Sequence, residues 1–429
     1  MMQIIADLHL HSKYSRATSP QMNIHDLERF AAIKGLNLLG TGDFTHPLHF
    51  NELKKDLSEK DQSGFFTTKN SQDVLFALSA EIALIYSDGE KVRKVHNIIL
   101  APSFEIVEQI NDELGKRGNL SADGRPIFGK ITCAAFMEMM TKISKDVMVI
   151  PAHAWTPWFS VFGSKSGFDG LQECFEDQTK NIFAIETGLS SDPAMNWRLS
   201  QLDNVALISN SDAHSPWSWR LGREANVFDL EKISYAEMVD AIKTKDKRKF
   251  LYTIETDPNY GKYHYDGHRD CNVSLTPDES KKLNEICPKC RRPLTIGVLN
   301  RVEQLADRRE GFVPKNAIPF KTLLPLYEII SHVLGISQLY SQKVMAEHDK
   351  IVAKFGPELN VLLNAGAEEL KTVTTEKIAE AIIKVRESGV KYIPGYDGVY
   401  GIPLFNGDNV EIKKSRIAQR GLEDFLKKN

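Results

Sequence analysis

The first 255 residues alternate between short apolar runs and longer amphipathic stretches. The short runs are rich in aliphatic and β-branched residues, which predicts strands at 3–9, 36–43, 74–82, 94–100, 147–153, 182–187 and 205–210. Helical spacing lies between several of them, as at 24–33, where Ile24, Leu27 and Phe30 share a face with Ala31. This alternation predicts an α/β fold with a parallel sheet, open or closed into a barrel.

The pattern changes twice beyond this region. Residues 256–300 are rich in Gly, Tyr, His and Cys and poor in long apolar runs, so they need a cross-link or a metal ion to hold them. Helical spacing then dominates, with helices predicted at 323–334, 344–355 and 378–387. We therefore expect domains at 1–255, 256–300 and 301–415 and a tail at 416–429, which fits a length of 429 residues.

Composition and charge narrow the class of protein. Hydrophobic residues make up 42% and charged residues 26%, as in soluble globular chains. No apolar run reaches the ~18 residues of a membrane span, and the N-terminus lacks secretory-signal features, so we expect a cytoplasmic protein with no membrane association. A net charge of −3 excludes a strongly basic nucleic-acid coat protein, but not a nuclease whose acidic residues hold cations.

Histidine and carboxylate residues lie in or just after the predicted strands. The first strand runs into His9-Leu-His11, and this spacing puts both imidazoles on one face of an extended chain. In a β/α barrel the carboxyl ends of the strands meet at one mouth, so these side chains are expected to converge. The candidate ligands are His9, His11, Asp43, His46, Glu81, His96, His153, Glu186, Asp212 and His214.

These ligands indicate several ions, because one ion needs only three or four of them. We expect two or three catalytic divalent ions, such as Zn²⁺, Mg²⁺ or Mn²⁺. Asp43 and His46 compete for a single role, and Glu186 is either a ligand or a residue that orients one.

Six motifs in a fixed order carry a family resemblance. LHLHS, GTGDFTHP, SAE, VHN, PAHAW and NSDAH resemble the PHP (polymerase and histidinol phosphatase) superfamily over about the first 230 residues. The resemblance implies a distorted seven-stranded β/α barrel with a three-metal site that hydrolyses phosphoesters. Two departures affect the third ion. Where the family often has a further His after His-x-His the chain reads Tyr14-Ser-Arg-Ala, and its second motif is Asp43-Phe-Thr-His46 rather than Thr-Asp-His.

The ligands also indicate the chemistry. Closely spaced cations lower the pKa of a bridging water toward ~7 and hold phosphate oxygens for in-line attack. We expect catalytic roles for the residues nearest this chemistry and for two arginines in the same loops, namely Asp212, Glu81, His153, Arg16 and Arg223.

A second metal site is predicted from cysteine spacing. His268-x-x-Cys271 and Cys287-x-x-Cys290 match a tetrahedral Zn²⁺ site with four protein ligands. His264 is the alternative to His268 as the fourth ligand. Such a closed site is structural and supplies folding energy to a region without a core of its own.

Aromatic residues and the domain order indicate the substrate. Four of the five tryptophans follow a proposed ligand within six residues and are expected to stack on bases, and two basic residues are expected to contact DNA. These residues are Trp155, Trp158, Trp217, Trp219, Lys13 and Arg220.

A barrel, a zinc site and a helical part in this order, with the stretches GKYHYDGHRDC, CPKCRRPLTIGVLNRVEQLADR and YIPGYDGVYG, resemble the endonuclease Q family. The resemblance implies a metal-dependent endonuclease of DNA repair. Such an enzyme nicks DNA 5′ of uracil, hypoxanthine, xanthine or an abasic site, with the lesion flipped out of the helix. The alternatives are a PHP phosphatase acting on a small phosphoester or nucleotide, and a non-catalytic DNA-binding adaptor.

The end of the chain carries a short peptide motif. Gln419, Leu422, Phe425 and Leu426 match the Q-x-x-L-x-x-F-L pattern of peptides that bind the sliding clamp PCNA. The same letters also fit the end of an ordinary amphipathic helix, so PCNA is a predicted partner with this alternative left open.

Overall fold

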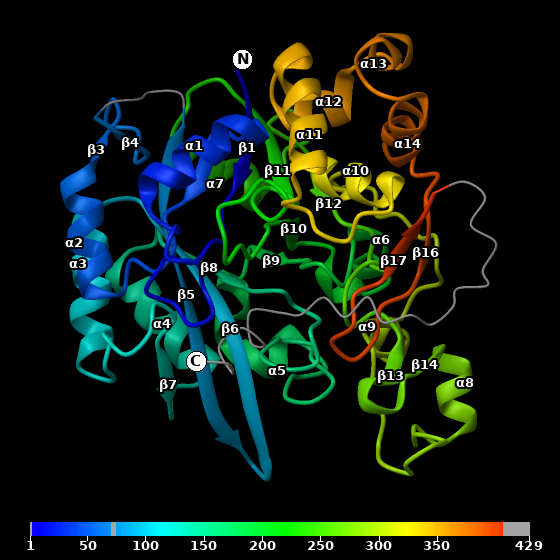
Figure 1. Cartoon of the computed structure of the whole chain (residues 1–429). Coiled ribbons are helices and arrows are strands. Elements are labelled where there is room, and N and C mark those ends of the chain that lie inside the picture. Colours follow the sequence, from blue (N-terminus) through cyan, green and yellow to red (C-terminus); the bar gives the residue numbers. More distant parts are fainter. Residues whose placement is uncertain (1, 70–73, 406–429) are drawn as a thin grey trace, which may run out of the picture.

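A large mixed sheet with helices packed around it forms the first part of the fold (Figure 1). The structure is a computed structural model that describes residues 2–69 and 74–405. The strands of the eleven-stranded sheet are β1 (Met2–Asp7), β2 (Leu38–Gly40), β3 (Leu57–Glu59), β4 (Phe66–Thr68), β5 (Leu75–Asp88), β6 (Lys91–Ala101), β7 (Ile127–Gly129), β8 (Met148–Pro151), β11 (Ala225–Leu230), β12 (Phe250–Glu255) and β15 (Phe320–Thr322). A separate parallel pair is formed by β9 (Ala184–Glu186) and β10 (Ala206–Ile208).

All seven predicted strands are present, but the sheet is mixed rather than parallel. Strands β1, β2 and β5 pair in parallel, whereas β5 with β6, β6 with β8, and β11 with both β1 and β12 are antiparallel. Among the described strands, no sheet closes into a barrel.

The reason for the mixed sheet lies in β5, which continues past Glu81 to Asp88 and turns directly into β6. Gly89 in this turn has a φ of +57°, which suits a tight hairpin. A connection this short joins only antiparallel strands, because parallel neighbours need a crossover.

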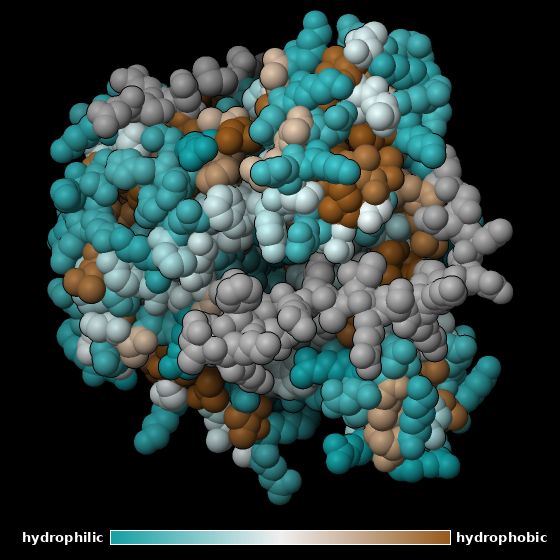
Figure 2. Space-filling model, in the orientation of Figure 1, coloured by the Kyte–Doolittle hydropathy of each residue, from teal (hydrophilic) through white to brown (hydrophobic). Residues whose placement is uncertain are grey.

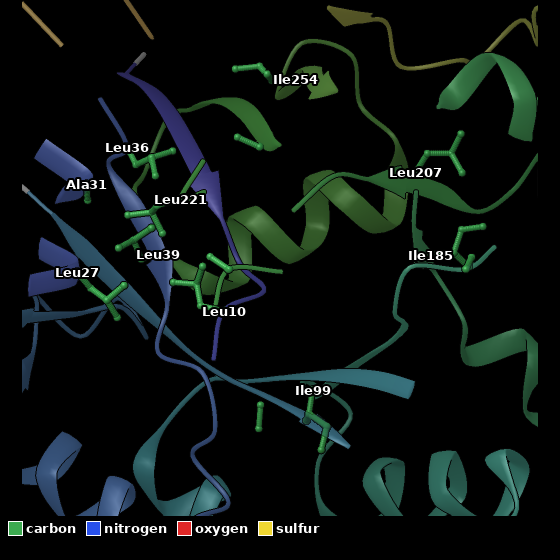
Figure 3. Close-up of a cluster of buried hydrophobic side chains, with 14 of the residues drawn as sticks. Leu10, Leu27, Ala31, Leu36, Leu39, Ile99, Ile185, Leu207, Leu221 and Ile254 are labelled. Atoms are coloured by element: carbon green, nitrogen blue, oxygen red, sulfur yellow. The ribbon is translucent and has the colours of Figure 1, made fainter. Parts of the chain in front are cut away.

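The predicted helix at 24–33 forms as α1 (Ile24–Lys34). It begins after Asn23, whose side chain accepts a hydrogen bond from the Asp26 N–H, and ends at Gly35 in the left-handed region. Its buried face packs on the sheet, and Figure 3 shows Leu27 and Ala31 beside Leu36 and Leu39. The other helices of this part are α2 (Pro47–Asp56), α3 (Phe104–Gly115), α4 (Cys133–Ile143), α5 (Leu171–Phe175), α6 (Pro193–Asn196) and α7 (Tyr235–Thr244), with short 3₁₀ turns η1 (Glu176–Asn181) and η2 (Ser200–Leu202).

The region at 256–300 is a small unit beside the sheet (Figure 1). It contains a two-stranded hairpin, one 3₁₀ turn and one short helix: β13 (Asp266–His268), η3 (Arg269–Cys271), β14 (Val273–Leu275) and α8 (Pro277–Lys282). Its own buried cluster is Val273, Cys287 and Leu294. The chain then forms α9 (Val298–Leu305) and returns to the central sheet, where β15 pairs in parallel with β12. Part of the region predicted to be helical therefore belongs to the sheet.

The three helices predicted near the C-terminus are present. They are α10 (Leu326–Leu334), α11 (Gln342–Phe355) and α14 (Glu376–Arg386), with α12 (Glu358–Asn364) and α13 (Ala367–Val373) between them and a hairpin of β16 (Lys391–Ile393) and β17 (Ile402–Leu404) after them. Hydrophilic residues cover most of the face seen in Figure 2, with hydrophobic residues in separate patches. No helix in the described ranges has the length and apolar character needed to cross a membrane.

Candidate metal centre

Two groups of ligand-type side chains lie side by side on the sheet. The first contains His9, His11 and Asp212, and the second contains Glu81, His96 and His153; within each group the ligand atoms lie within 4.8 Å of one another. The sequence predicted all six as ligands, so the fold brings together residues spread over more than 200 positions of the chain.

The first group is built from the end of β1 and the loop after β10. Leu8 and Leu10 are buried in the core, which turns the alternating His9 and His11 to the opposite face. Leu10 forms a β-bridge with Ala213, and this pairing brings Asp212 beside the histidines. The Asp212 Oδ1 lies 3.2 Å from His11 Nε2 and 3.7 Å from His9 Nε2.

Glu81 connects the two groups. Its Oε1 lies 2.8 Å from His96 Nδ1 and 3.1 Å from His153 Nε2. Its Oε2 lies 3.3 Å from His11 Nε2. One buried carboxylate thus faces both groups, which is the arrangement expected of a carboxylate shared by two neighbouring ions.

Three of the predicted ligand residues have an unusual backbone conformation. Asp43, His153 and Asp212 have φ values of +44°, +31° and +49°. For residues other than glycine this region costs on the order of 1–3 kcal/mol each, and such strain concentrates at functional sites. The surrounding structure therefore holds the backbone of these three residues in a conformation that directs their side chains toward the centre.

The charges of the centre are balanced internally. Burial favours the neutral form of Glu81, but the positive charges of His96 and Arg125 outweigh it and hold the pKa of Glu81 well below its usual range. Burial also favours the neutral form of Asp212, but the close approach of His11 and the charge of His9 likewise keep the Asp212 pKa well below its usual range. Both carboxylates are ionised at neutral pH.

Three ligand-type atoms of the centre lack hydrogen-bond partners in the described part of the chain. His9 Nε2, His11 Nε2 and Asp212 Oδ1 are buried and have no hydrogen-bond partner among the described residues. Buried polar atoms without partners are costly, and imidazole nitrogens and carboxylate oxygens are preferred ligands of Zn²⁺ and Mn²⁺. The donor set therefore fits divalent cations.

Glu186 and Asp43 lie behind the histidines rather than with the two ligand groups. Both carboxylate oxygens of Glu186 lie 3.1 Å from His9 Nδ1, and Glu186 also accepts hydrogen bonds from the His153 N–H and from Asn210. Asp43 Oδ1 lies 3.1 Å from His11 Nδ1. A carboxylate on the far nitrogen of a ligating imidazole fixes its tautomer and orientation.

His46 and His214 do not belong to either ligand group. His46 is buried and its ring stacks on Tyr14 at 4.3 Å. His214 lies beside the first group, with its ring 4.5 Å from that of His11 and its Nδ1 3.0 Å from the Asp212 carbonyl oxygen.

The four predicted zinc ligands come together in the small unit. His268, Cys271, Cys287 and Cys290 form the third group of ligand atoms within 4.8 Å of one another, and His264 is not part of it. The His268 Nε2 lies 3.9 Å from the Cys290 Sγ. The Cys287 carbonyl accepts a hydrogen bond from the Arg291 N–H, so the two cysteines sit on a tight turn. This set fits a tetrahedral Zn²⁺ ion.

The predicted DNA-stacking role of Trp155 is wrong. Its side chain is 1% exposed, its ring packs on Phe162 and its Nε1–H donates to Asn196 at 2.7 Å, so it is a core residue. Trp158 is 39% exposed, and the edge of one ring faces the other where it meets Tyr263, at a centroid distance of 6.1 Å. Trp217 and Trp219 stack on each other at 5.6 Å, and Trp219 packs on Tyr327 of α10.

The basic residues that were predicted to contact DNA or to act in catalysis have protein partners in this structure. Arg220 forms a 3.2 Å ion pair with Glu328, and Lys13 forms one of 2.9 Å with Glu52. Arg16 is 83% exposed at its side chain and pairs with Asp123. Arg223 donates two hydrogen bonds to the Ser211 carbonyl and so supports the loop that carries Asp212.

One residue beside the centre was not predicted from the sequence. The Arg125 Nη1 lies 3.0 Å from the Glu81 Oε2. Arg125 lies in the connection between α3 and β7, away from any predicted strand end, so the strand-end pattern gave no signal for it. The predicted clamp residues Gln419, Leu422, Phe425 and Leu426 lie outside the described residues.

Comparisons with known proteins agree with this architecture over the whole chain. The crystal structure of the lesion-specific endonuclease PfuEndoQ from Pyrococcus furiosus superposes with a TM-score of 0.84 at 32% identity, covering 99% of each chain. A structure of endonuclease Q with a 27-mer duplex carrying an abasic lesion at the active site gives the same TM-score and identity, over 97% of this chain and 99% of that one.

Sequence relatives extend the comparison. The uncharacterised protein YqxK from Bacillus subtilis is 29% identical over 94% of this chain and 99% of its own length. The uncharacterised protein MJ0043 from Methanocaldococcus jannaschii is 33% identical over 64% of this chain, but the match spans only 34% of that longer protein. Residues 325–389 match the family of the MJ0043 C-terminal domain, which corresponds to the helices α10 to α14.

The fold, shared over its full length with these nucleases, and its paired histidine–carboxylate groups define a DNA-cleaving hydrolase. Identity above 30% across nearly the complete chain makes the assignment more specific. The chain belongs to the endonuclease Q family.

Proposed function

We propose that this protein nicks DNA in repair, at the phosphodiester 5′ of a deaminated base (uracil, hypoxanthine or xanthine) or of an abasic site. The observation that carries the proposal is the pair of ligand groups joined by Glu81, in a chain that aligns over 99% of its length with a lesion-specific endonuclease. The endonuclease Q complex with an abasic-lesion duplex supports damaged DNA as the partner. An enzyme with this substrate would act on chromosomal DNA in the cytoplasm.

The domain organisation proposed for this function has three parts. Strands β1, β2, β5, β6, β8, β9 and β10 would be the seven strands of a distorted PHP-type barrel within residues 1–255. Residues 256–300 would be a zinc-binding domain and residues 301–415 a helical domain. The parallel pairing of β15 with β12 ties the last part to the first, which supports a fixed relation between the helical part and the catalytic centre.

The two ligand groups are the proposed positions of the catalytic ions. His9, His11 and Asp212 would hold one divalent ion, and Glu81, His96 and His153 a second. When bound, such ions lower the pKa of a water molecule and neutralise charge on the phosphate. Glu186 and Asp43 would keep the imidazoles of His9 and His11 in the tautomer that ligation requires.

The reaction is a hydrolysis with a simple balance of bonds. The oxygen of water forms a bond to phosphorus, and the bond from phosphorus to the 3′ oxygen breaks. Water gives up one proton and the 3′ oxygen gains one, leaving a 3′-hydroxyl and a 5′-phosphate. Of these two carboxylates, Asp212 is the one that a substrate can reach, because its side chain is 33% exposed while that of Glu81 is fully buried.

A labelled duplex with a single deoxyinosine tests the proposal. With divalent ions we expect one nick, immediately 5′ of the deoxyinosine, and no product from an undamaged duplex or in the presence of a chelator. The Asp212→Asn variant should bind the duplex and not nick it. Equal cutting of damaged and undamaged duplexes would refute the lesion preference. Hydrolysis of p-nitrophenyl phosphate without any nicking would favour the small-phosphoester alternative.

The proposal includes one protein partner. Gln419, Leu422, Phe425 and Leu426 are proposed to bind a PCNA-type sliding clamp, with Leu422, Phe425 and Leu426 filling an apolar groove. The basis is the sequence motif and the proposed repair role of the protein.

A further inference from the structure

Asp7, at the end of β1, is a buried carboxylate with no part in the ligand groups. It is the last residue of the strand and is 0% exposed. The alternation of an extended chain puts its side chain on the face of His9 and His11. It nevertheless belongs to none of the clustered ligand groups found among the described residues. The hydrogen bonds of Asp7 account for this difference from the two histidines.

Both oxygens of Asp7 accept hydrogen bonds from backbone N–H groups. Its Oδ1 accepts from the Ser211 N–H at 3.0 Å, and its Oδ2 accepts from the Gly222 N–H at 2.9 Å. Ser211 and Gly222 are buried, so each N–H would lack a partner without this side chain, at a cost in stability. We call this pair of hydrogen bonds the Asp7 bridge.

The Asp7 bridge closes the neck of the loop that carries Asp212. This loop, residues 211–223, is named the Asp212 loop. Its two ends meet at one side chain, as in a compact Ω-loop. A glycine suits the second end, because Gly222 has a φ of +61° and a Cβ there would lie 2.8 Å from the Leu36 side chain.

Asp212 lies between two residues that are fixed to the sheet. On one side the Ser211 carbonyl accepts two hydrogen bonds from Arg223, while its N–H belongs to the Asp7 bridge. On the other side the Ala213 carbonyl accepts from the His11 N–H at 3.1 Å. Asp212 itself has a φ of +49°, which a residue other than glycine adopts only when its neighbours hold it there. Its side-chain position therefore depends on the neck of the loop.

The far side of the Asp212 loop is attached to the helical part. The Trp219 ring packs on Tyr327 at 4.9 Å, and Arg220 pairs with Glu328 at 3.2 Å. Both partners lie on α10. A displacement of α10 would therefore move the far side of the loop. A closed neck keeps such a movement from reaching Asp212.

We propose that Asp7 is a positioning residue for DNA cleavage, because the Asp7 bridge fixes the Asp212 carboxylate beside His9 and His11. This inference rests on the proposed role of Asp212 in hydrolysis. Asp7 does not touch the reacting atoms and acts through the backbone of the Asp212 loop. Misplacing a catalytic group by about 1 Å can cost roughly 100-fold in rate, even when the altered residue is remote from the chemistry.

The first test is the Asp7→Asn variant, which keeps the size of the side chain. An amide has one acceptor oxygen, so its NH₂ group would face one of the two backbone N–H groups and that hydrogen bond would be lost. With bis(p-nitrophenyl) phosphate as substrate, kcat should fall roughly 100-fold at unchanged KM. The affinity for a deoxyinosine duplex, measured without added divalent ions, should equal that of the parent protein. A parental kcat would overturn the proposal.

Asp266→Asn is the matched control. Asp266 is also fully buried and joins separate segments, since it accepts from the Gly297 N–H and from the Asn300 side-chain amide, both at 2.6 Å. It lies on β13 of the small unit and not at the centre. Both variants should lower the midpoint of thermal unfolding, but Asp266→Asn should keep the parental kcat on the small diester. An equal loss of kcat in both would indicate a general loosening of the fold and would overturn the proposal.

Hydrogen exchange gives a readout that does not depend on activity. Peptides covering residues 211–223 should exchange faster in Asp7→Asn than in the parent, and peptides from β5 and β6 should not. Gly222→Ala disturbs the same neck from its other end, so it should show the same local change and a lowered kcat even if Asp7→Asn does not fold. Parental exchange of the Asp212 loop in these variants would overturn the proposal.

The small diester also separates this inference from the proposed function. Bis(p-nitrophenyl) phosphate reports phosphodiester hydrolysis whatever the lesion preference. If the parent protein hydrolyses this compound but does not cut deoxyinosine duplexes, the proposed function fails. The effect of Asp7→Asn on hydrolysis of the small diester still decides the inference.

Discussion

A buried ion pair between the first part of the fold and the helical part gives a quantitative prediction. The Lys34 Nζ at the end of α1 lies 2.7 Å from the Glu358 Oε1 at the start of α12, and the two side chains are 1% and 0% exposed. Lys34 also donates to the Ser218 carbonyl at 2.8 Å, in the loop that follows His214. Glu358 further accepts from the Leu326 N–H, so the pair and its hydrogen-bond partners join four segments of the chain.

The perturbation is Lys34→Met, which keeps an unbranched side chain, one atom shorter, and removes its charge. Glu358 would remain as a buried carboxylate without its cation, and breaking a buried pair in this way costs about 3–5 kcal/mol. Burial alone would raise the pKa of Glu358, but the charges of Lys34 and His348 outweigh it and lower the pKa to about 2 from the usual 4.5. A shift of this size corresponds to about 3 kcal/mol, shared between Lys34 and His348.

The free energy of unfolding is measured by urea titration, followed by tryptophan fluorescence, since Trp217 and Trp219 flank Ser218. Lys54→Met is the matched control, because its 2.9 Å pair with Glu108 is 40% and 52% exposed and should be worth only about 0.2–1 kcal/mol. The double variant Lys34→Met/Glu358→Gln should lose less stability than the sum of the two single changes, because it leaves no unpaired charge.

The pH dependence has a defined sign. The lowered pKa of Glu358 contributes stability that is fully present above pH 4.5 and is lost as the pH falls from about 4.5 to 2. The Glu358→Gln variant should lack this component. If Lys34→Met destabilises the protein no more than Lys54→Met, or if the pH profiles of the parent and Glu358→Gln coincide, the reasoning about the pair is refuted.

Three further predictions concern the zinc site, the orientation of the ligands and the tail. The Cys287→Ser variant should lose one tightly held Zn²⁺, and its residues 256–300 should become sensitive to protease, because a cluster of three buried side chains cannot replace the metal. The control variant Cys133→Ser, changed in the main core, should retain the zinc of the parent protein. Unchanged zinc content in both variants would contradict the assignment. Glu186→Gln should weaken binding of a divalent ion about 10–100-fold in calorimetry, since Glu186 accepts from His9, whereas parental affinity would remove its orienting role. Phe425→Ala should weaken clamp binding about thirtyfold while nicking of free oligonucleotides stays unchanged, and equal clamp affinity would refute the motif.

Local patterns predicted much of the fold. The strands and the helix at 24–33 could be found because apolar spacing acts within a few residues. The antiparallel arrangement of β5 and β6 could not be predicted in this way. The predicted strand ends at Ile82, whereas β5 continues to Asp88 and the hairpin turn follows it. Once the strand continues to Asp88, Glu81 and His96 meet in the middle of two strands rather than at two strand ends.

In the candidate site, too, features set by neighbouring residues could be predicted, whereas features set by the folded chain could not. His9 and His11, or Cys287 and Cys290, are close in sequence, so their spacing carries the chemistry directly. Trp155 follows a ligand by two residues and points into the core instead of the site, since sequence proximity does not fix the direction of a side chain. Arg125 reaches Glu81 across 44 residues of chain, a contact made only by the folded loop.

The central claim is that Glu81 joins two ligand groups into one catalytic centre for lesion DNA. Single-turnover nicking of a deoxyinosine duplex by the parent and by Glu81→Gln tests it most directly, with thermal unfolding and zinc content measured alongside. We expect the parent to cut one bond, 5′ of the deoxyinosine and only with divalent ions. The variant should keep its fold and its cysteine-bound zinc but nick at least about 100-fold more slowly. Nicking by Glu81→Gln at the parental rate would contradict the account.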